Sequence, residues 1–381
     1  MAIYQIGRTG RRYCAQEATY GVAPTLVATD ALRHLSVKMS EPTARVNSPE
    51  RHVHPSQVYR FTRRRGASYS VSGILYPSGT LNTLPDMAGI LEATFGSQRN
   101  VTLSTTVAAS PSPTTTVFTV ASVTGLAVGD PVLINATTGG RQVRWITAIN
   151  TLALTVAPAL SAAPVTGDTV KGCVGYTPTT ALLATGSLDL AWYRTSISYE
   201  MKGCAPDSLK IMVDANDEVR FELSGPAATR TRPAQSDPAT FTVAGSAPPS
   251  GLTGYLRVNA GAEEFLKASF ELKNGIELDN VAFGTSAAQA MYRAKKREVA
   301  INLETMVSDD VTILDLAANS TDHTHVVQCG LTEGSIVAWY CPLLELEMGE
   351  DPDNDETNVR SHKGVAKGSG SGNNELYLAL A

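Results

Sequence analysis

The stretch Tyr59-Arg60-Phe61-Thr62-Arg63-Arg64-Arg65 leads directly into the alternating segment Ser68-Tyr69-Ser70-Val71-Ser72-Gly73-Ile74. The same order returns later, where Tyr292-Arg293-Ala294-Lys295-Lys296-Arg297 leads into Glu298-Val299-Ala300-Ile301-Asn302-Leu303-Glu304. Each copy continues after a turn into a short apolar segment that begins with an aspartate, Asp86 or Asp310. A repeat of this kind predicts two copies of one β-rich unit in a single polypeptide.

The composition is that of a globular protein with 381 residues, 43% of them hydrophobic and 18% charged, and a net charge of −5. This length allows two or three domains, and the absence of a basic excess argues against a dedicated nucleic-acid binder. No segment approaches the roughly 20 consecutive apolar residues of a membrane helix, and the N-terminus lacks the apolar region of a secretory signal. We therefore expect folding in a cytoplasm and no membrane partner.

The order of alternating segments and turns predicts a mainly β fold with two repeated units, each carrying a short helix. The first unit is expected at 1–99 and 173–224, and the second at 254–381. A charge-poor stretch at 100–172 is expected to form an inserted small β-module, and the Pro- and Thr-rich residues 225–253 a linker. Insertions in surface loops cost little closure entropy, so the module should lie outside the core.

Within these units, several elements are expected at defined places. The N-terminal residues 1–30 should be an irregular arm, and strands should resume at 187–200. A helix capped by Thr83 or Asp86 should end at Gly96, because glycine favours helix C-termini. The segment 342–381 should be a long excursion that closes with a strand.

Catalytic signatures are absent from the sequence. Gly368-Ser369-Gly370-Ser371-Gly372 matches a nucleophile elbow only by letter, because it lies in a Gly/Ser-rich run rather than at a strand-to-helix turn. No dinucleotide-binding or phosphate-binding glycine motif occurs. We expect no enzyme activity, no catalytic residue and no cofactor.

Candidate metal ligands are weak. His52 and His54, like His323 and His325, would share one face of a strand, but neither pair has a carboxylate or thiolate partner at a fixed spacing. We expect them to be strand residues that face solvent or an interface. The segment 351–362 begins with the spacing of a calcium loop but lacks its glycine and its final glutamate. The five scattered cysteines predict free thiols, so no metal site is expected.

Charged clusters are the strongest candidates for a functional surface. Basic residues precede the repeated strand in both units, and seven acids fall between Glu345 and Glu356. Contact with nucleic acid and a solvated loop are alternative interpretations of the basic clusters. We favour basic loops that meet acidic loops of a neighbouring subunit, since complementary charge fixes register. The expected contacts are Arg60, Arg63, Arg64, Arg65, Arg293, Lys295, Lys296, Arg297, Glu350, Asp351, Asp353 and Asp355.

The chain resembles the tail tube protein, or major tail protein, of long-tailed bacteriophages. The resemblance rests on the arm Gln16–Thr25, the strand-turn-helix segment 68–96, the strand pair within 203–225, the block beginning at Phe270, and the C-terminal Asn373–Leu378. It implies tube domains built as β-sandwiches, whose inner strands join between subunits into a barrel. The implied role is a structural virion protein that polymerises into stacked rings, a conduit for DNA ejection into the host.

The resemblance also implies partners. These are further copies of the chain, the tape measure, tail terminator and tail tip proteins, and viral DNA that passes through an acidic bore without specific binding. Assembly would take place in the host bacterial cytoplasm. Two units per chain predict a ring of three chains with pseudo-sixfold symmetry, with a hexamer as the alternative.

Two other classes compete with the tube. The first is another virion component, such as a tail terminator, baseplate hub or decoration protein, and self-polymerisation into long tubes would discriminate against it. The second is a carbohydrate-binding or hydrolytic β-protein, which usually shows exposed aromatic platforms or paired carboxylates in a cleft.

Overall fold

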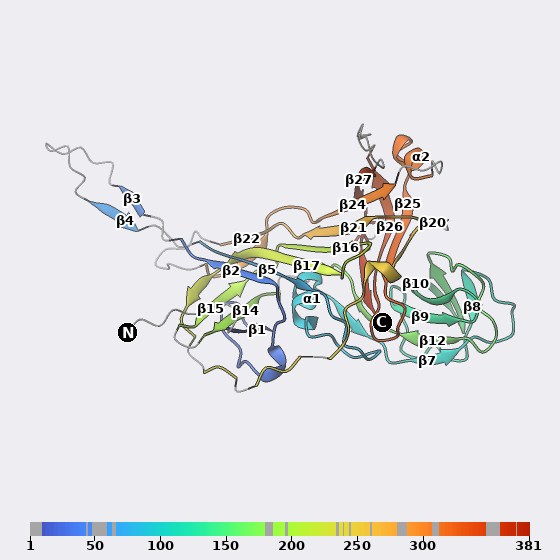
Figure 1. Ribbon diagram of the computed structural model, residues 1–381, viewed down its shortest axis with the longest axis horizontal. Coiled ribbons are helices and arrows are strands. Elements are labelled where there is room, and N and C mark those ends of the chain that lie inside the picture. Colours follow the sequence, from blue (N-terminus) through green and yellow to red (C-terminus); the bar gives the residue numbers. More distant parts are fainter. Residues whose placement is uncertain are drawn as a thin grey trace.

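The described part of the chain consists mainly of antiparallel strands with two α-helices, α1 (Ala88–Phe95) and α2 (Thr312–Ala318), in this computed structural model (Figure 1). The predicted mainly β fold is confirmed. The described residues are 10–42, 45–47, 59–62, 66–179, 186–194, 197–233, 236–238, 240–243, 245–259, 261–279, 288–306, 312–347, 359–370 and 372–381.

A large sheet of fourteen described strands runs through the molecule, and successive strands along its main path are antiparallel. The order along that path is β2 (Ser36–Ser40), β5 (Ala67–Ile74), β17 (Arg220–Ala227), β16 (Ser208–Asp214), β21 (Lys267–Lys273), β24 (Glu298–Met306), β27 (Val359–Ala366), β26 (Val337–Leu346), β25 (His323–Cys329), β19 (Tyr255–Val258) and β20 (Gly261–Glu263).

Strand β26 belongs to two layers. Its first half pairs with β25 on one side and with β28 (Tyr377–Leu380) on the other, whereas Leu344–Leu346 pair with β27. Beyond β28, the sheet is extended by β13 (Val174–Tyr176) and β6 (Gln98–Asn100).

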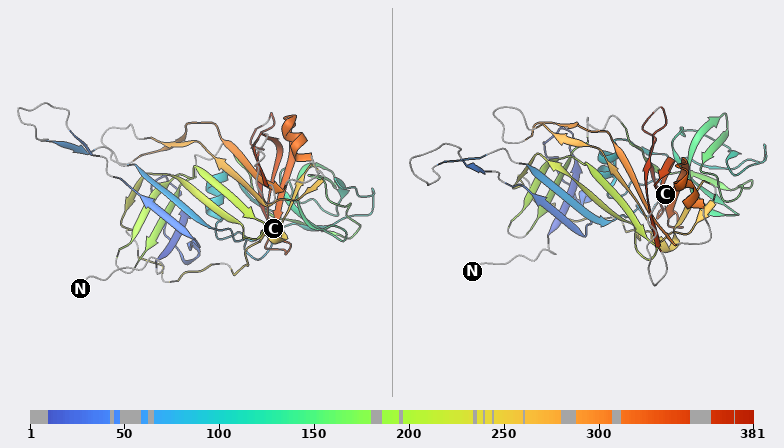
Figure 2. Two further views of the ribbon diagram at one scale, coloured as in Figure 1. Left: turned by 45° about the horizontal axis from the view of Figure 1, so that its top comes forward. Right: turned by 90° about the horizontal axis from the view of Figure 1, so that it is seen from above.

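A second sheet of four strands packs against the beginning of the large sheet (Figures 1 and 2). Its order is β1 (Arg11–Gln16), β14 (Leu188–Tyr193), β15 (Tyr199–Cys204) and β18 (Thr229–Thr231). Leu190 and Met201 of this sheet share one buried cluster with Val71 and Leu223 of the large sheet. Burial of these apolar side chains, worth about 25 cal/mol per Å², holds the two layers together as a sandwich.

Residues 104–172 form a separate sheet of six strands with its own core (Figure 1). Its order is β7 (Ser104–Thr106), β12 (Thr169–Gly172), β9 (Pro131–Ala136), β10 (Gly140–Asn150), β11 (Ala153–Ala157) and β8 (Val117–Thr119). The opposite side of this sheet packs on the end of the large sheet, where Trp145 stacks on Tyr340 with ring centroids 5.2 Å apart.

Two excursions leave the large sheet at the same end of its strands. One contains the paired strands β3 (Arg45–Asn47) and β4 (Arg60–Thr62), which lie well beyond the end of β2 and β5 (Figures 1 and 2). The other contains β22 (Ile276–Leu278) and β23 (Met291–Arg293) between β21 and β24.

Several local predictions were wrong. Residues 11–16 of the expected irregular arm form β1. The expected linker at 225–253 begins with the end of β17 and with β18. Short 3-10 helices, η2 (Ala28–Asp30) and η4 (Gly251–Thr253), complete the described elements. Helix α1 does end at the predicted Gly96, whose φ of 85° suits glycine.

Candidate assembly surface

The large sheet has one apolar face in the sandwich core and one polar face toward solvent. In β5, Tyr69 and Val71 are buried while Ser68, Ser70 and Ser72 alternate with them. The same alternation continues through β17, β16, β21 and β24. We call the solvent side of these strands, together with β2 and β27, the polar face.

The polar face is divided into two chemically different parts. Its β2–β5 part carries small hydroxyl side chains and one lysine, Lys38, which lies opposite Ser70. The serines are Ser36, Ser40, Ser68, Ser70 and Ser72. The part formed by β17, β16, β21 and β24 carries charged side chains of both signs. Arg220 of β17 lies on this face opposite Met212, and Lys363 of the adjoining β27 lies opposite Asn302. The remaining lysines and carboxylates form a group that we call the junction lattice: Lys210, Lys267, Lys273, Asp214, Glu222, Glu271, Glu298 and Glu304.

Strand register places each lysine of the junction lattice beside carboxylates. Lys210 lies directly opposite Glu222 on one neighbouring strand and Glu271 on the other. Directly opposed side chains in antiparallel strands have Cβ atoms about 5 Å apart, so opposite charges attract. The Oγ of Ser208 also donates a hydrogen bond to Oε1 of Glu271, at 2.9 Å.

The other two lysines make ion pairs. Lys267 lies between Asp214 and Glu304, with its Nζ 3.0 Å from Oε2 of Glu304. Its pKa is raised above the usual value, first by the hydrogen bond to Glu304 and then by the charges of Glu304 and Asp214. Lys273 lies opposite Glu298, and its Nζ is 3.4 Å from Oε2 of Glu271.

Most of the predicted contact residues fall outside the described residues. These are Arg63, Arg64, Arg65, Glu350, Asp351, Asp353 and Asp355. Arg60 is described at the start of β4, where its Nε donates a 3.2 Å hydrogen bond to Oδ1 of Asn47 on β3. Arg60 is exposed and lies in the excursion beyond the sheet (Figure 1).

The second basic cluster is divided between surface and interior. Lys295 and Lys296 are exposed, whereas Arg293 is half-buried, and burial followed by the charge of Arg297 lowers its pKa. Arg297 pairs with Glu375 and donates hydrogen bonds to the carbonyl of Thr179 and, at 2.9 Å, to Oδ1 of Asn373. Arg297 therefore ties the start of β24 to the C-terminal segment of its own chain.

The N-terminal arm contains a contact that charge patterns did not indicate. The carboxylate of Glu17 accepts hydrogen bonds from the backbone N–H groups of Gly21 and Gly203, both at 2.8 Å, and from the Oγ of Ser187 at 2.7 Å. Gly203 has a φ of 61°, and a Cβ there would lie 3.0 Å from the ring of Tyr20. The Glu17-to-Gly21 segment is thus fastened to β15.

The histidines of the second unit are core residues. His323 and His325 are 2% and 0% exposed, so the expectation that they face solvent or an interface was wrong. Burial lowers the pKa of His325 to about 3, with a smaller effect from His323. His52 and His54 lie outside the described residues. Among the described residues, no group of three or more potential ligands could hold a metal ion.

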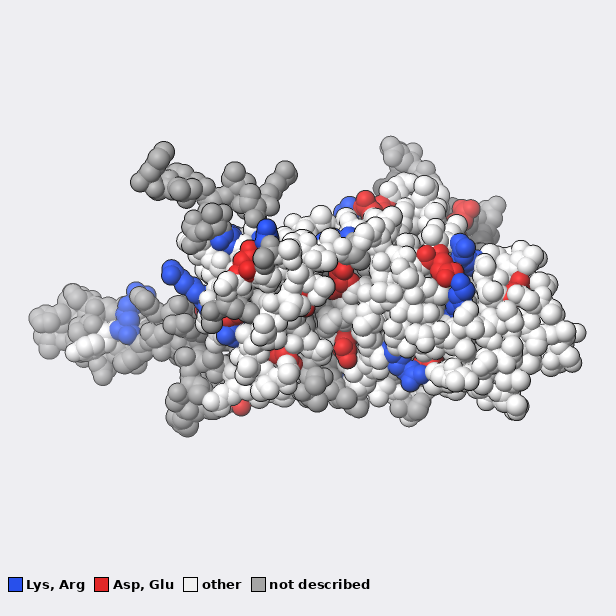
Figure 3. Space-filling model, turned by 90° about the horizontal axis from the view of Figure 1, so that it is seen from below, with Lys and Arg blue, Asp and Glu red and all other residues white. Residues whose placement is uncertain are grey.

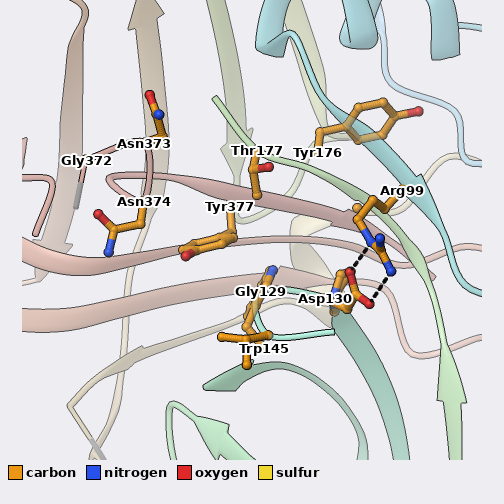
Figure 4. Close-up of a pocket in the computed structure, with 13 residues that line it drawn as sticks. Arg99, Gly129, Asp130, Trp145, Tyr176, Thr177, Gly372, Asn373, Asn374 and Tyr377 are labelled. Atoms are coloured by element: carbon orange, nitrogen blue, oxygen red, sulfur yellow. Dashed lines mark hydrogen bonds and ion pairs between the residues drawn. The ribbon is translucent and has the colours of Figure 1, made fainter. Parts of the chain in front are cut away.

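A cavity of about 360 Å³ lies where the six-stranded sheet meets the C-terminal segment (Figure 4). On the wall of the cavity, Nε and Nη2 of Arg99 lie 2.6 and 2.9 Å from the two carboxylate oxygens of buried Asp130. The rings of Trp145 and Tyr377 line the same cavity. The charged residues of the six-stranded sheet region are buried or bonded within the chain, so this end of the molecule shows few charges (Figure 3).

The surface described above is an extended sheet face rather than a catalytic cleft. Neither described helix has the length and apolar character that a membrane crossing needs. A comparison with curated proteins finds no match. The family described as phage tail tube protein matches residues 7–338, which is most of the chain. The chain therefore belongs to the phage tail tube protein family and is a structural protein of the phage tail.

Proposed function

We propose that the chain assembles into stacked rings of three copies that form the tail tube, through which the genome leaves the virion. The observation that carries this proposal is a repeated strand order. In the large sheet, the series β2-β5-β17-β16 is followed directly by β21-β24-β27-β26. In both series an excursion joins the first and second strands, and a helix follows the second. This order supports two units per chain.

The other layer of the sandwich supports the same duplication. The order β1-β14-β15-β18 corresponds to β19-β25-β26-β28. Both layers also share a register shift at the same place, between Leu188 and Leu190 in β14 and between His323 and His325 in β25. Since β-bulges are specific features of a strand pair, their agreement favours duplication over chance similarity.

A pair of glycines marks equivalent positions in the large sheet. Gly225 of β17 pairs with Tyr69, and Gly364 of β27 pairs with Ile301. A Cβ at Gly225 would lie 1.9 Å from the carbonyl oxygen of Ala205, and one at Gly364 would lie 2.8 Å from that of Glu345. Both units thus bring a backbone carbonyl against the same strand position.

The junction between the units provides a template for the contact between chains. Inside the chain, β16 of the first unit pairs with β21 of the second. The equivalent strands at the two ends of the series are β26 and β2, and the alternation of directions makes them antiparallel when copies are placed side by side. Repeating one head-to-tail contact closes a ring, and closure removes free strand edges. Three chains with two units each would supply six units.

The remaining features fit this arrangement. The core face of the large sheet is covered by the other layer, so the polar face would line the bore, with the six-stranded sheet outside. Both excursions leave the large sheet at the same end of its strands, where they would reach the next ring. Arg60, Lys295 and Lys296 would meet acidic segments there. The tape measure, terminator and tail tip proteins would be partners of the tube, which would assemble in the host bacterial cytoplasm.

Negative-stain electron microscopy of the purified full chain tests the proposal. Long hollow tubes are expected after concentration. Discrete closed rings that do not stack would favour a tail terminator or baseplate hub instead. A chain that stays monomeric under all virion-like conditions would refute assembly through the sheet edges.

A further inference from the structure

The cavity between the six-stranded sheet and the C-terminal segment has no role in the proposed tube. Its volume of about 360 Å³ falls within the range of about 300–1,000 Å³ that is usual for small-molecule pockets. Residues of β9 and β10, of β6 and β13, and of the segment 372–377 line it together (Figure 4). In the proposed tube the six-stranded sheet lies outside, so the cavity would stay open to the surroundings of the virion.

Part of the cavity wall is aromatic. The rings of Trp145 and Tyr377 both pack on Tyr340, with ring centroids 5.2 and 5.9 Å from that of Tyr340. Tyr377 is half-buried, and the neighbouring Gly129 has no side chain to cover its ring, because a Cβ there would lie 3.7 Å from Cε1 of Tyr377. The Tyr377 ring is thus fixed by its neighbours and accessible from the cavity.

The same cavity contains hydrogen-bonding groups without protein partners. Nη1 of Arg99 and the hydroxyl groups of Thr177 and Tyr377 make no hydrogen bond within the described part of the chain. Arg99 is held in place by Asp130, which is 2% exposed, and by the carbonyl of Gly125 at 3.2 Å. Arg99 and Asp130 are the charged residues among the described lining residues, and their charges cancel.

The rim formed by the C-terminal segment is fixed in advance. Oδ1 of Asn374 accepts a hydrogen bond from the backbone N–H of Ser369 at 2.8 Å, and Nδ2 of Asn374 donates one to Oγ of Ser369 at 2.9 Å. Arg297 donates a hydrogen bond to Oδ1 of Asn373 at 2.9 Å. A site whose groups are already held in place loses less conformational entropy when a ligand binds.

We propose that this cavity binds one pyranose ring of a neutral saccharide. A pyranose has a face of C–H groups and a rim of hydroxyl groups, so the face would lie on the Tyr377 ring and the rim would meet Arg99 and Thr177. Because the charges of Arg99 and Asp130 cancel, the cavity favours a neutral ligand over a phosphate or a nucleotide. The inference goes beyond the tube and does not depend on it.

Saturation-transfer NMR on the purified full chain tests the inference. The probes are the methyl glycosides of glucose, galactose, mannose and N-acetylglucosamine, with adenosine as an aromatic probe that is not a pyranose. At least one glycoside should bind with a dissociation constant on the order of 1 mM, as expected for so small a ligand. A hexasaccharide of the same sugar that binds at least as tightly identifies a polysaccharide unit as the ligand, whereas its exclusion identifies a free sugar.

Variants locate the binding in the cavity. Combining Thr177→Val with Tyr377→Phe removes two hydroxyl groups and keeps the shape of the cavity, and it should weaken binding at least about tenfold. The matched control combines Thr332→Val with Tyr292→Phe, which removes two exposed hydroxyl groups outside the cavity lining and should leave binding unchanged. Thermal unfolding checks that both proteins fold.

A second pair of variants keeps the inference falsifiable if the double variant does not fold. Val128 lines the cavity and is 64% exposed, so Val128→Trp should obstruct the entrance and weaken binding without disturbing the core. Val165→Trp, at an exposed position of the same six-stranded sheet region that does not line the cavity, is its control.

Three results would overturn the inference. They are no signal from any glycoside at about ten times the expected dissociation constant, equal binding by the cavity variants and the wild type, and tighter binding of adenosine than of every glycoside. Electron microscopy tests the tube separately. Tubes formed by a chain that binds no sugar would refute this inference alone, and sugar binding by a chain that forms no tubes would refute the proposed function alone.

Discussion

Asp189 is a buried carboxyl whose replacement should stabilise the protein. It lies in β14, is fully buried, and neither of its oxygens has a hydrogen-bond partner among the described residues. Burial is the main reason that its pKa is raised to about 8, and the charges of Glu200 and Glu17 raise it further, whereas Lys202 lowers it. We predict that Asp189→Asn increases the free energy of unfolding at neutral pH.

The magnitude follows from proton linkage. The ordinary pKa of 3.8 applies to the unfolded chain, so between pH 3.8 and 8 the folded chain holds a proton that the unfolded chain has lost. Stability from this group is therefore full below about pH 4 and is lost as the pH rises toward 8. Each pH unit above 3.8 lowers the free energy of unfolding by about 1.4 kcal/mol. The total loss is about 4 kcal/mol at pH 7 and under about 2 kcal/mol at pH 5.

Asparagine imitates the neutral carboxyl and cannot ionise in the unfolded chain. Chemical denaturation at pH 5 and pH 7 should show a gain for Asp189→Asn that is larger at pH 7 by up to about 3 kcal/mol. Exposed Asp315→Asn is the control and should change stability by less than about 0.5 kcal/mol at either pH. An Asp189→Asn gain that does not depend on pH, or a loss at both values, would refute the buried-carboxyl argument.

Three further variants test other parts of the fold. Burial lowers the pKa of His325 to about 3, so its contribution to the free energy of unfolding is full above about pH 6.5 and is lost as the pH falls. In denaturation curves, His325→Leu should therefore reduce the loss of stability between pH 7 and pH 5 by about 2 kcal/mol. Gly225→Ala forces a methyl group against the Ala205 carbonyl and should cost about 3 kcal/mol in the same assay, and a neutral result would contradict the close approach. Arg297→Ala leaves Glu375 unpaired and should cost about 3 kcal/mol, with faster hydrogen exchange in 377–380; unchanged exchange there would contradict the tie.

Local sequence patterns predicted the strands whose two faces differ. Alternation in 68–74 and 298–304 corresponds to β5 and β24, because one face of each strand is buried and the other is solvated. Strand β27 was missed since its core-facing positions include His362 and Gly364, which give no apolar alternation. Strand β1 was missed because it begins with Arg11 and Arg12 directly after Gly10, and its burial does not alternate cleanly.

The junction lattice could not be predicted from the sequence. Alternation shows which residues of one strand share a face, but it does not reveal that Lys267 lies between Asp214 and Glu304, which are far apart in the chain. Similarly, Arg297 looked like part of an exposed basic cluster, although its partner Glu375 is 78 residues away. Long-range register decides both cases, and local patterns do not encode it.

A cryo-electron microscopy reconstruction of the assembled tube tests the central claim most directly, because it counts the chains around one ring. The proposal predicts three chains per ring, with β26 of one chain antiparallel to β2 of the next in the way that β16 pairs with β21. A ring of six chains, or chains that meet through other surfaces, would contradict it.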